Sequence, residues 1–345
     1  MADAKTWDVA VVGAGIAGAS AAAELSRDRK VALLEREGAP GHHTTGRSAA
    51  LFSTTYGPAV IRALSRASQA FYESPEAGFA SHPLLRPRGT LFVAREGQGE
   101  AMERLEAQLA PEGGIERLGV AAACAALPLL RREGLLGALL EAEARDIDVD
   151  ALHQGFLRAF AARGGALLTD AGVTAIARVG GVWRIETPRG EVRAEVLVNA
   201  AGAWADRLAE AAGAAPRGLI PKRRTAMIVP GPEGVDPSPW RMAVDVEETW
   251  YLKPEAGKLL ISPADETPSP PCDAQPAELD VAMAVERVQA ACDLDVRRIE
   301  RKWAGLRSFS PARLPVYGPD PEIDGFEWFA GQGGYGIRSE ERRVW

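Results

Sequence analysis

An apolar run followed by regularly spaced glycines opens the chain. Residues 9–12 are apolar throughout, glycines follow at three nearby positions, and residues 19–25 are rich in alanine. A short apolar run indicates a buried strand, and alanine favours a helix. The pattern therefore predicts a strand, a tight turn and a helix. A second strand is predicted over residues 30–36.

The spacing of these glycines is typical of a dinucleotide-binding turn. Gly13 permits the turn, Gly15 lets the backbone approach a pyrophosphate, and Gly18 lets the helix pack closely on the strand. The phosphates then bind the unpaired N–H groups of the helix N-terminus. Glu35 lies 22 residues after Gly13, where this fold places a carboxylate on the adenosine ribose. A dinucleotide site is expected, but this motif does not choose between NAD and FAD.

Two later segments repeat the pattern of a strand that ends in glycines. Residues 196–198 are predicted to be a buried strand before the turn at 199–202, and residues 328–330 precede four glycines. Between residues 173 and 195, apolar and polar positions alternate around two glycine turns, which predicts a β-meander. Three glycine-rich strand ends are more than one NAD needs. They suit a cofactor that extends through the molecule, with adenine at one end and a redox ring at the other.

Helical patterns and turns continue the prediction. An apolar pattern with a period of 3.6 follows Asp150, which we expect to be the N-cap, and Gly164–Gly165 ends that helix. Two strands are expected about a turn at residues 254–257, and a helix with Pro276 in its first turn follows. The proline-rich residues 264–276 are a surface loop by composition, with a mobile lid over the active site as the alternative.

Composition narrows the class of protein. The 345 residues are 46% hydrophobic and 25% charged, which is typical of a globular protein with material for two domains. The formal charge of −7 argues against nucleic acid as a partner. No run of 18 apolar residues occurs, so we expect no transmembrane segment and a cytoplasmic monomer. The three cysteines have neither disulfide nor zinc spacing.

Several short motifs occur in a fixed order between residues 7 and 337. They are VVGAGIAGAS, LLERE, TTGRSAA, DIDVDALHQGFLR, VLVNAAGAW, PKRR, WYLKPEAG, WAGLRSF and GQGGYGI. With these motifs the chain resembles the D-amino acid oxidase family of FAD-dependent oxidoreductases, and within it is similar to the bacterial D-arginine dehydrogenases.

The resemblance implies a fold of class α/β and α+β in two parts. A discontinuous Rossmann-like FAD-binding domain would comprise residues 1–85, 145–220 and 300–337. A substrate domain built on an antiparallel sheet would comprise residues 86–144 and 221–299. The FAD would be non-covalent, because family members with covalent FAD use a cysteine near the last glycine motif and none lies there.

The resemblance also implies the oxidative deamination of a D-amino acid. The flavin N5 would accept a hydride from Cα, and water would hydrolyse the resulting imine to a keto acid and ammonia. The electrons would pass to a quinone, another carrier or O₂. Two alternatives stay open, which are an amine oxidase of the glycine or sarcosine type and a truncated FAD-binding protein without turnover.

Candidate site residues follow from the matched motifs. A zwitterionic substrate needs a cation for its carboxylate, and arginine offers two parallel hydrogen bonds. Arg307 and Arg224 match this position, and Tyr56 and Tyr251 match the pocket tyrosines near the amine and the carboxylate. No histidine, aspartate or glutamate is an obvious base, and water is expected to take the substrate's ammonium proton.

The remaining candidates form two sets. The substrate pocket is expected to be lined by Leu51, Ser53, Thr90, Met242 and Gly334. The FAD is expected to contact Gly13, Ala14, Gly15, Ile16, Ala17, Gly18, Glu35, Arg36, Thr44, Thr45, Gly46, Arg47, Ser48, Ala49, Ala50, Leu51, Val173, Ala201, Gly202, Trp204, Gly331, Gly333, Gly334, Tyr335, Gly336 and Ile337.

The polar stretch at residues 41–57 is expected to join these two sets. Residues 44–50 would open a short helix whose N–H groups and hydroxyls hold the pyrophosphate and the flavin's linker, and residues 51–56 would be a wall of the substrate pocket. His42 and His43 suggest a metal site. However, sequence neighbours point apart in an extended chain, and no Cys, Asp or Glu joins them at ligand spacing, so no metal is expected.

Two positions depart from the pattern of the arginine-active enzymes. Thr90 stands where those enzymes carry an acidic residue, and Leu51 stands where they carry a histidine. A neutral hydroxyl cannot offset the desolvation of a guanidinium group. We therefore expect a preference for neutral or apolar D-amino acids over D-arginine.

The end of the chain also departs from the family. Residues 338–345 read RSEERRVW, where the family continues into a long helix. We expect this tail to be non-native and the terminal helix to be missing, which would uncover apolar surface on the FAD-binding domain.

Overall fold

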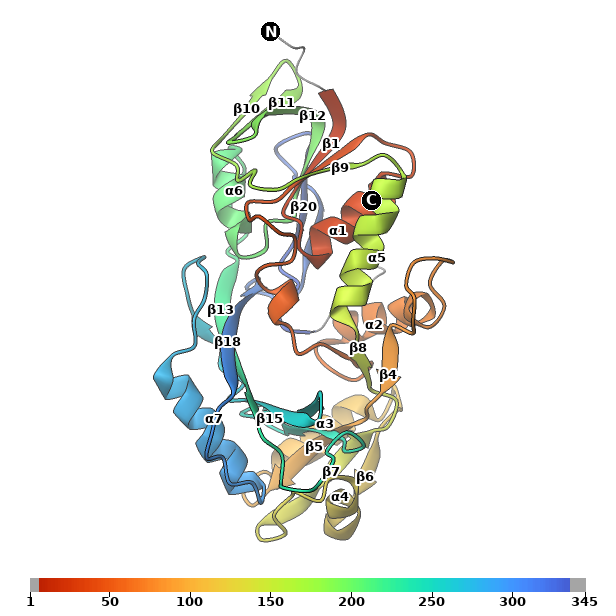
Figure 1. The fold of residues 1–345 in the computed structure, drawn as a ribbon, viewed down its shortest axis with the longest axis vertical. Coiled ribbons are helices and arrows are strands. Elements are labelled where there is room, and N and C mark those ends of the chain that lie inside the picture. Colours follow the sequence, from red (N-terminus) through yellow and green to blue (C-terminus); the bar gives the residue numbers. More distant parts are fainter. Residues whose placement is uncertain (1–5, 336–345) are drawn as a thin grey trace.

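Two large sheets and one small sheet organise the chain (Figure 1). The computed structural model describes residues 6–335. The first large sheet contains β1 (Thr6–Val12), β2 (Val31–Leu34), β9 (Ala166–Leu168), β10 (Ala175–Val179), β11 (Val182–Thr187), β12 (Gly190–Asn199), β19 (Val316–Pro319) and β20 (Phe326–Ala330).

The first sheet has a parallel centre. Its strands follow the order β10-β11-β12-β1-β2-β9, and β20 pairs with both β12 and β19. The pairs β12–β1, β1–β2, β2–β9 and β12–β20 are parallel. Because the carboxyl ends of parallel strands meet at one edge of a sheet, the glycine segments after β1, β12 and β20 converge there. The meander β10-β11-β12 is antiparallel, as its alternating pattern predicts.

Helices cover this sheet. They are α1 (Ile16–Leu25), α5 (Val149–Ala162) and α6 (Ala205–Ala211), which follows the 3₁₀ turn η2 (Gly202–Trp204). Helix α1 packs against α5, because its small alanine side chains leave room for a close approach. The buried residues Val9, Val11, Leu33, Phe156 and Phe160 belong to the same core. An apolar strand run followed by an alanine-rich helix thus forms the layered unit that the sequence predicts.

The second large sheet contains β5 (Thr90–Arg95), β6 (Glu116–Leu118), β7 (Leu135–Glu141), β13 (Ile220–Val229), β14 (Met242–Asp245), β15 (Tyr251–Glu255), β16 (Lys258–Ser262), β17 (Thr267–Pro268) and β18 (Arg301–Phe309). Its order is β17-β13-β16-β15-β14-β5-β7-β6, with β18 also paired to β13. All of these pairs are antiparallel except β14–β5, which is parallel. Figure 1 shows β13 and β18 running between the regions of the two sheets.

Short elements complete the fold. They are β3 (Leu51–Phe52), β4 (Leu85–Pro87) and β8 (Arg145–Ile147) in the small sheet, the 3₁₀ turn η1 (Thr45–Arg47), and helices α2 (Ala59–Glu73), α3 (Gly99–Leu109), α4 (Val120–Ala126) and α7 (Glu278–Ala291). The predicted fold class is confirmed, since helices flank a parallel sheet and a second, largely antiparallel sheet follows.

Four local predictions are wrong in detail. Asp148, not Asp150, caps α5, because the helix begins at Val149 and the Asp148 Oδ1 accepts a bond from the Ala151 N–H at 2.9 Å. Pro276 precedes α7, whose N-cap is Ala277. The two other corrections concern residues 44–50 and residues 264–276.

The short helix expected within residues 44–50 is the single 3₁₀ turn η1, and the chain then enters β3. The side chains of Thr44 and Arg47 donate to carbonyl groups of β18, and that of Thr45 accepts from the N-terminus of α1. Residues 264–276 are not loop throughout, because β17 pairs with β13. The tertiary partner decides the local structure in both segments.

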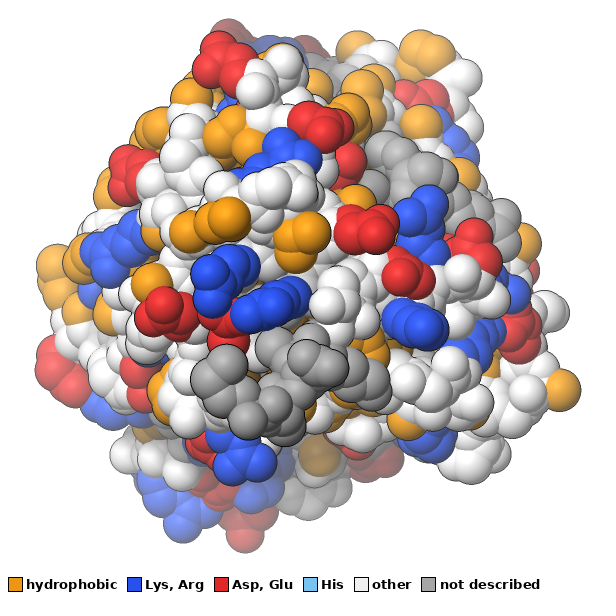
Figure 2. All heavy atoms as spheres, turned by 90° about the horizontal axis from the view of Figure 1, so that it is seen from above, with side chains coloured by type: hydrophobic (Ala, Val, Ile, Leu, Met, Phe, Trp, Pro, Cys, Tyr) orange, Lys and Arg blue, Asp and Glu red, His pale blue; other side chains and the backbone are white. Residues whose placement is uncertain are grey.

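Charges of both signs are mixed across the face shown in Figure 2, which is the view from above Figure 1. Lys and Arg side chains do not gather in one patch on this face, and apolar side chains are scattered. Among residues 6–335, no helix combines the length and the apolar character that crossing a bilayer would require.

Candidate active site

A cavity of about 940 Å³ is lined by residues of both large sheets. At one end lie Val12 and Leu34, at the carboxyl ends of β1 and β2. At the other end lie Thr90 and Met242, on neighbouring strands of the second sheet. A cavity of this size is at the upper end of the usual range for ligand pockets, about 300–1,000 Å³. It joins the predicted cofactor and substrate sites in one space.

The turn after β1 requires glycine at two positions. Gly13 has φ +103°, and a Cβ there would lie 2.4 Å from the carbonyl oxygen of Ala200. A Cβ at Gly18 would lie 1.7 Å from the carbonyl oxygen of Gly13. No side chain fits at either contact. Gly13 lines the cavity, whereas Gly18 only allows α1 to approach the turn.

Both backbone polar groups of Ala14 in this turn contact side chains. Its N–H donates to the Glu35 Oε2 at 3.0 Å, and its carbonyl oxygen lies 2.9 Å from the Nε2 of His153 on α5. The Glu35 Oε1 accepts from the Glu37 N–H at 3.0 Å. Glu35 therefore shapes the turn as well as lining the cavity. Burial lowers the pKa of His153 and favours its neutral form.

Sequence reasoning missed His153. The residue lies on the buried face of a predicted helix, a place where most side chains only fill the core. Its position beside the turn becomes evident only when α1 and α5 pack together.

The polar stretch at residues 41–57 divides between the cavity and the second sheet. Thr44, Thr45, Ser48, Ala49, Ala50, Leu51, Ser53 and Tyr56 line the cavity. The Thr45 Oγ1 accepts from the Ile16 N–H at 3.0 Å, at the N-terminus of α1. Gly46 and Arg47, for which cofactor contacts are expected, do not line the cavity. The guanidinium of Arg47 instead donates to the carbonyl oxygens of Ala274 and Ala304, each at 3.0 Å.

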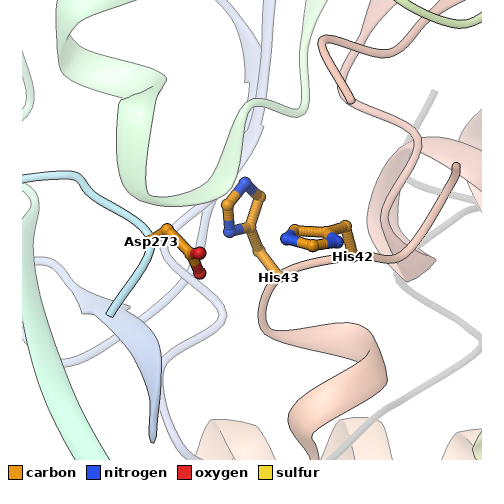
Figure 3. Close-up of side chains that lie close together, drawn as sticks. All are labelled: His42, His43 and Asp273. Atoms are coloured by element: carbon orange, nitrogen blue, oxygen red, sulfur yellow. The ribbon is translucent and has the colours of Figure 1, made fainter. Parts of the chain in front are cut away.

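His42 and His43 of this stretch lie close to Asp273 (Figure 3). One potential ligand atom from each lies within 4.8 Å of the others. The argument that no acidic residue joins the histidines is therefore wrong, because a distant segment supplies Asp273. However, Asp273 forms an ion pair with Arg47, and the His43 Nε2 lies 2.9 Å from the Glu37 Oε1. Asp273 and His43 thus each have a protein partner, and the Arg47–Asp273 ion pair joins two distant segments.

Arg224 and Arg307 face the cavity from two adjacent strands. Lys222 of β13 is directly opposite Arg307 of β18, and Arg224 lies two residues further along β13. Residues two apart on a strand share a face, so the two arginines are diagonal neighbours. Arg224 donates from Nε to the carbonyl oxygen of Asp265 at 2.8 Å.

The guanidinium of Arg307 has no hydrogen-bond or ion-pair partner among residues 6–335, although its backbone pairs with β13. Burial and the charge of Arg224 both lower the pKa of its guanidinium. A desolvated cation without a counter-ion is costly. An anion bound in the cavity would offset that cost, and a carboxylate matches the two parallel N–H groups of arginine.

Tyr56 and Tyr251 line the same end of the cavity, together with a carboxylate that sequence reasoning missed. The Tyr56 Oη donates to the Glu248 Oε2 at 3.0 Å. Burial and the nearby carboxylate raise the pKa of Tyr56, so its hydroxyl stays protonated. Glu248 lies in the turn between β14 and β15 with φ +58°. The turn brings Glu248 to Tyr56, and nothing in the sequence around Glu248 indicates this contact.

A mostly apolar wall completes this end. The residues expected in the substrate pocket, Leu51, Ser53, Thr90, Met242 and Gly334, all line this cavity, and Phe92 and Val244 extend the wall on the strands of Thr90 and Met242. The Thr90 Oγ1 is buried and has no hydrogen-bond partner among the described residues. One hydroxyl in an apolar wall can meet a single polar group of a ligand.

The other predicted cofactor residues fall into three groups. Those that line the cavity are Gly15, Ile16, Ala17, Arg36, Val173, Ala201, Gly202, Trp204, Gly333 and Tyr335. Those that do not line it, besides Gly18, Gly46 and Arg47, are Ala14 and Gly331. Gly336 and Ile337 lie outside the described residues, as does the tail at 338–345.

Comparisons with known proteins agree with this geometry. A family model described as FAD dependent oxidoreductase matches residues 8–339. Dimethylglycine dehydrogenase of Homo sapiens mitochondria is 30% identical over 234 residues, which cover 61% of this chain and 26% of that protein. The sarcosine dehydrogenase of Mus musculus is 24% identical over 342 residues, covering 93% of this chain and 37% of that protein. The matches thus span about a quarter to a third of the relatives' lengths.

Among solved structures, glycine oxidase from Geobacillus kaustophilus superposes with a TM-score of 0.83 at 22% identity. The match covers 98% of this chain and 91% of that one. At this identity the likeness concerns the fold.

Proposed function

The chain belongs to the family of FAD-dependent oxidoreductases, and from that premise we propose that it oxidises the carbon–nitrogen bond of a D-amino acid with a neutral or apolar side chain. The observation that carries the proposal is the unpartnered guanidinium of Arg307, which faces the cavity beside Arg224. Such a pair is suited to the carboxylate of an amino acid.

The residues present fit FAD. Gly13 and Gly15 bring bare backbone to the cavity where any Cβ at Gly13 would collide with Ala200. Glu35 would bind the adenosine ribose, the N-terminus of α1 with Thr45 would hold the pyrophosphate, and residues 48–51 and 333–335 would enclose the flavin end. When bound, the flavin supplies the acceptor for the electrons and the hydrogen that leave the substrate.

The chain's own residues orient the substrate. Arg307 and Arg224 bind its carboxylate and fix Cα relative to the cofactor, which reduces the entropic cost of reaching a reactive geometry. Tyr56 and Tyr251 close the same end of the cavity and exclude water. The ammonium group must lose a proton before oxidation. Glu248, bonded to Tyr56, is a candidate acceptor alongside water.

The substrate class follows from the mostly apolar wall at this end of the cavity. Leu51, Thr90, Phe92, Met242 and Val244 present apolar groups and one hydroxyl. None of these five side chains carries a charge, and the one carboxylate described at this end, that of Glu248, accepts from the Tyr56 hydroxyl, so D-arginine is disfavoured. The similarity to D-arginine dehydrogenases therefore does not carry their substrate to this chain. The D configuration itself rests on the sequence resemblance.

A second candidate is the oxidation of glycine or an N-methylated glycine. The human and mouse relatives are named dimethylglycine and sarcosine dehydrogenases, and the same pair of arginines would bind the carboxylate of such substrates. These substrates would leave the apolar wall unfilled. The electron acceptor, whether a quinone, another carrier or O₂, is a further part of the proposal.

Anaerobic reduction of the FAD-loaded protein tests the proposal. We expect D-methionine, D-leucine or D-phenylalanine to bleach the flavin absorbance with a higher kcat/KM than D-arginine, glycine, sarcosine or dimethylglycine. A higher value for D-arginine would contradict the predicted side-chain preference, and a higher value for sarcosine would favour the second candidate. If no amine bleaches the flavin, the chain binds FAD without turnover. Repetition in air with peroxide detection separates O₂ from other acceptors.

Replacement of Arg307 tests the carboxylate site. Arg307→Lys keeps the charge but removes the bidentate geometry, so we expect KM to rise roughly tenfold to a thousandfold. Arg301→Lys, on the exposed start of the same strand, is the matched control. An unchanged KM in Arg307→Lys would remove Arg307 from the substrate site.

A further inference from the structure

Residues 53–57 carry cavity side chains without any regular secondary structure. The segment follows β3 and precedes α2, and its residues form only bends. Ser53 and Tyr56 both line the cavity. Because no ladder of backbone hydrogen bonds defines this segment, side-chain contacts must set its conformation.

One of these contacts is the buried carboxylate of Glu141. It is the last residue of β7 and only 1% exposed. Its Oε2 accepts from the Ser53 Oγ at 2.7 Å and from the Thr55 Oγ1 at 2.8 Å. Its Oε1 accepts from the Thr54 N–H at 2.8 Å and faces the Thr54 Oγ1 at 3.4 Å. Within residues 6–335, every hydrogen bond to this carboxylate comes from the segment.

Glu141 lacks a cationic partner among the described residues. Burying a carboxylate costs free energy unless donors satisfy its oxygens. Here three consecutive residues of one segment supply the donors, so the carboxylate and the segment conformation depend on each other. Glu141 does not line the cavity, but it pairs across the sheet with Thr90, which does.

The far end of the segment is fixed separately. Arg62 of α2 donates to the carbonyl oxygen of Gly57 at 2.6 Å and forms an ion pair with Glu112. Tyr56 thus lies between two anchored points. Its hydroxyl reaches Glu248, and its ring centroid lies 5.7 Å from that of Tyr335.

We propose that Glu141 is a positioning residue, which holds residues 53–55 so that Tyr56 and Ser53 face the substrate carboxylate and amine. The inference rests on the proposed function for the identity of the substrate. Glu141 acts through Tyr56 and does not itself touch the substrate. Its loss should therefore loosen the segment and weaken substrate binding while leaving the cofactor end intact.

Glu141→Gln tests this with an almost unchanged side-chain shape. An amide offers one acceptor oxygen and one donor group, so it cannot accept all the bonds that the carboxylate accepts. We expect KM for the amino acid to rise about tenfold, with FAD content and kcat changed much less. Glu143→Gln is the matched control, because the Glu143 side chain is 78% exposed. An unchanged KM in Glu141→Gln would overturn the proposal.

Hydrogen–deuterium exchange gives a readout that does not need turnover. The Thr54 N–H donates to Glu141, and the Thr55 N–H donates to the Ser53 Oγ at 3.3 Å. Both amides should exchange faster in Glu141→Gln than in the wild type or Glu143→Gln, without faster exchange in β1. Equal exchange rates in this segment would contradict the anchoring role. If Glu141→Gln does not fold, Thr55→Val removes a single donor and should show the same local effect.

A double-mutant cycle with Tyr56→Phe separates positioning from general destabilisation. If Glu141 acts through Tyr56, Glu141→Gln should raise KM less in the Tyr56→Phe protein than in the wild type. Purely additive effects would overturn the proposal. A wild-type protein that no amine reduces would contradict the proposed function instead, and the exchange experiment would still decide whether Glu141 anchors the segment.

Discussion

The imidazole of His153 lies against the dinucleotide turn and is 3% exposed. Its Nε2 is 2.9 Å from the carbonyl oxygen of Ala14, which can only accept, so Nε2 carries the proton. The N–H of Ala14 is held by Glu35. Two side chains from distant segments thus fix the residue between Gly13 and Gly15, the two glycines of this turn that line the cavity.

We expect His153 to make stability depend on pH. Its pKa in the folded protein is lowered by burial, so the unfolded chain takes up the proton first as the pH falls. The stabilisation is complete above about pH 6.5 and is lost as the pH falls below it, with a slope of up to ~1.4 kcal/mol per pH unit until the folded pKa is reached.

His153→Gln keeps a donor for Ala14 without a titrating ring and should reduce this slope. Urea unfolding at several pH values between about 5 and 8 measures the free energy of unfolding. His82→Gln is the control, since the His82 side chain is 42% exposed. An identical slope in wild type and His153→Gln would show that other groups cause the pH dependence.

At the scale of elements, the N-terminus of α5 gives a direct test of helix capping. The Asp148 carboxylate accepts from the Ala151 N–H, whereas Asp150 lies within the first helical turn. Removing an N-cap side chain costs about 0.5–2 kcal/mol. An acid in the first turn contributes only about 0.3–1 kcal/mol through the helix dipole.

Asp148→Ala should therefore lower the free energy of unfolding more than Asp150→Ala does. Because Asp148 also contacts His82 at 2.9 Å, His82→Gln measures that contribution separately. A larger loss in Asp150→Ala would contradict the assignment of Asp148 as the cap.

The pairing of β13 with β18 brings Arg224 and Arg307 together at the cavity. Arg224 and Arg307 are 83 residues apart in the sequence. The antiparallel register of β13 and β18 nevertheless makes them diagonal neighbours. Sequence motifs indicated both residues. Their adjacency depends on a long-range register that no local pattern specifies.

At the scale of the whole molecule, the cavity is lined by residues of both large sheets, so a bound cofactor would contact both. A ligand that binds only the folded state stabilises it by about 2.7 kcal/mol at 100 times its Kd. We expect FAD to raise the Tm of the cofactor-stripped protein more than NAD or FMN does. Thermal unfolding at equal ligand concentrations measures this difference. An equal or larger rise with NAD would contradict FAD selectivity.

The predicted division into two discontinuous domains stays a prediction at this scale. The second sheet contains strands that precede residue 145, β5 to β7, and strands that follow it, β13 to β18. Thermal unfolding with two separate transitions would support two domains, because each would have its own cooperative core.

The sequence by itself determined the features that depend on neighbouring residues. The apolar run, the glycine spacing and the alanine-rich segment specify the turn after β1, because backbone conformation and close contact allow only glycine at Gly13 and Gly18. The ordered motifs likewise indicated FAD through the family resemblance, and about half of the residues that line the cavity belong to the sets expected from them.

Only the tertiary structure decided which distant groups meet. Glu248 reaches Tyr56, Glu141 reaches residues 53–55, His153 reaches Ala14, and Asp273 pairs with Arg47 rather than completing an evident metal site. Each of these polar contacts joins segments that are far apart along the chain. Local patterns specify strands, turns and helices. The partner that offsets the cost of burying a polar or charged group is set by the tertiary packing, because that partner lies on a distant segment.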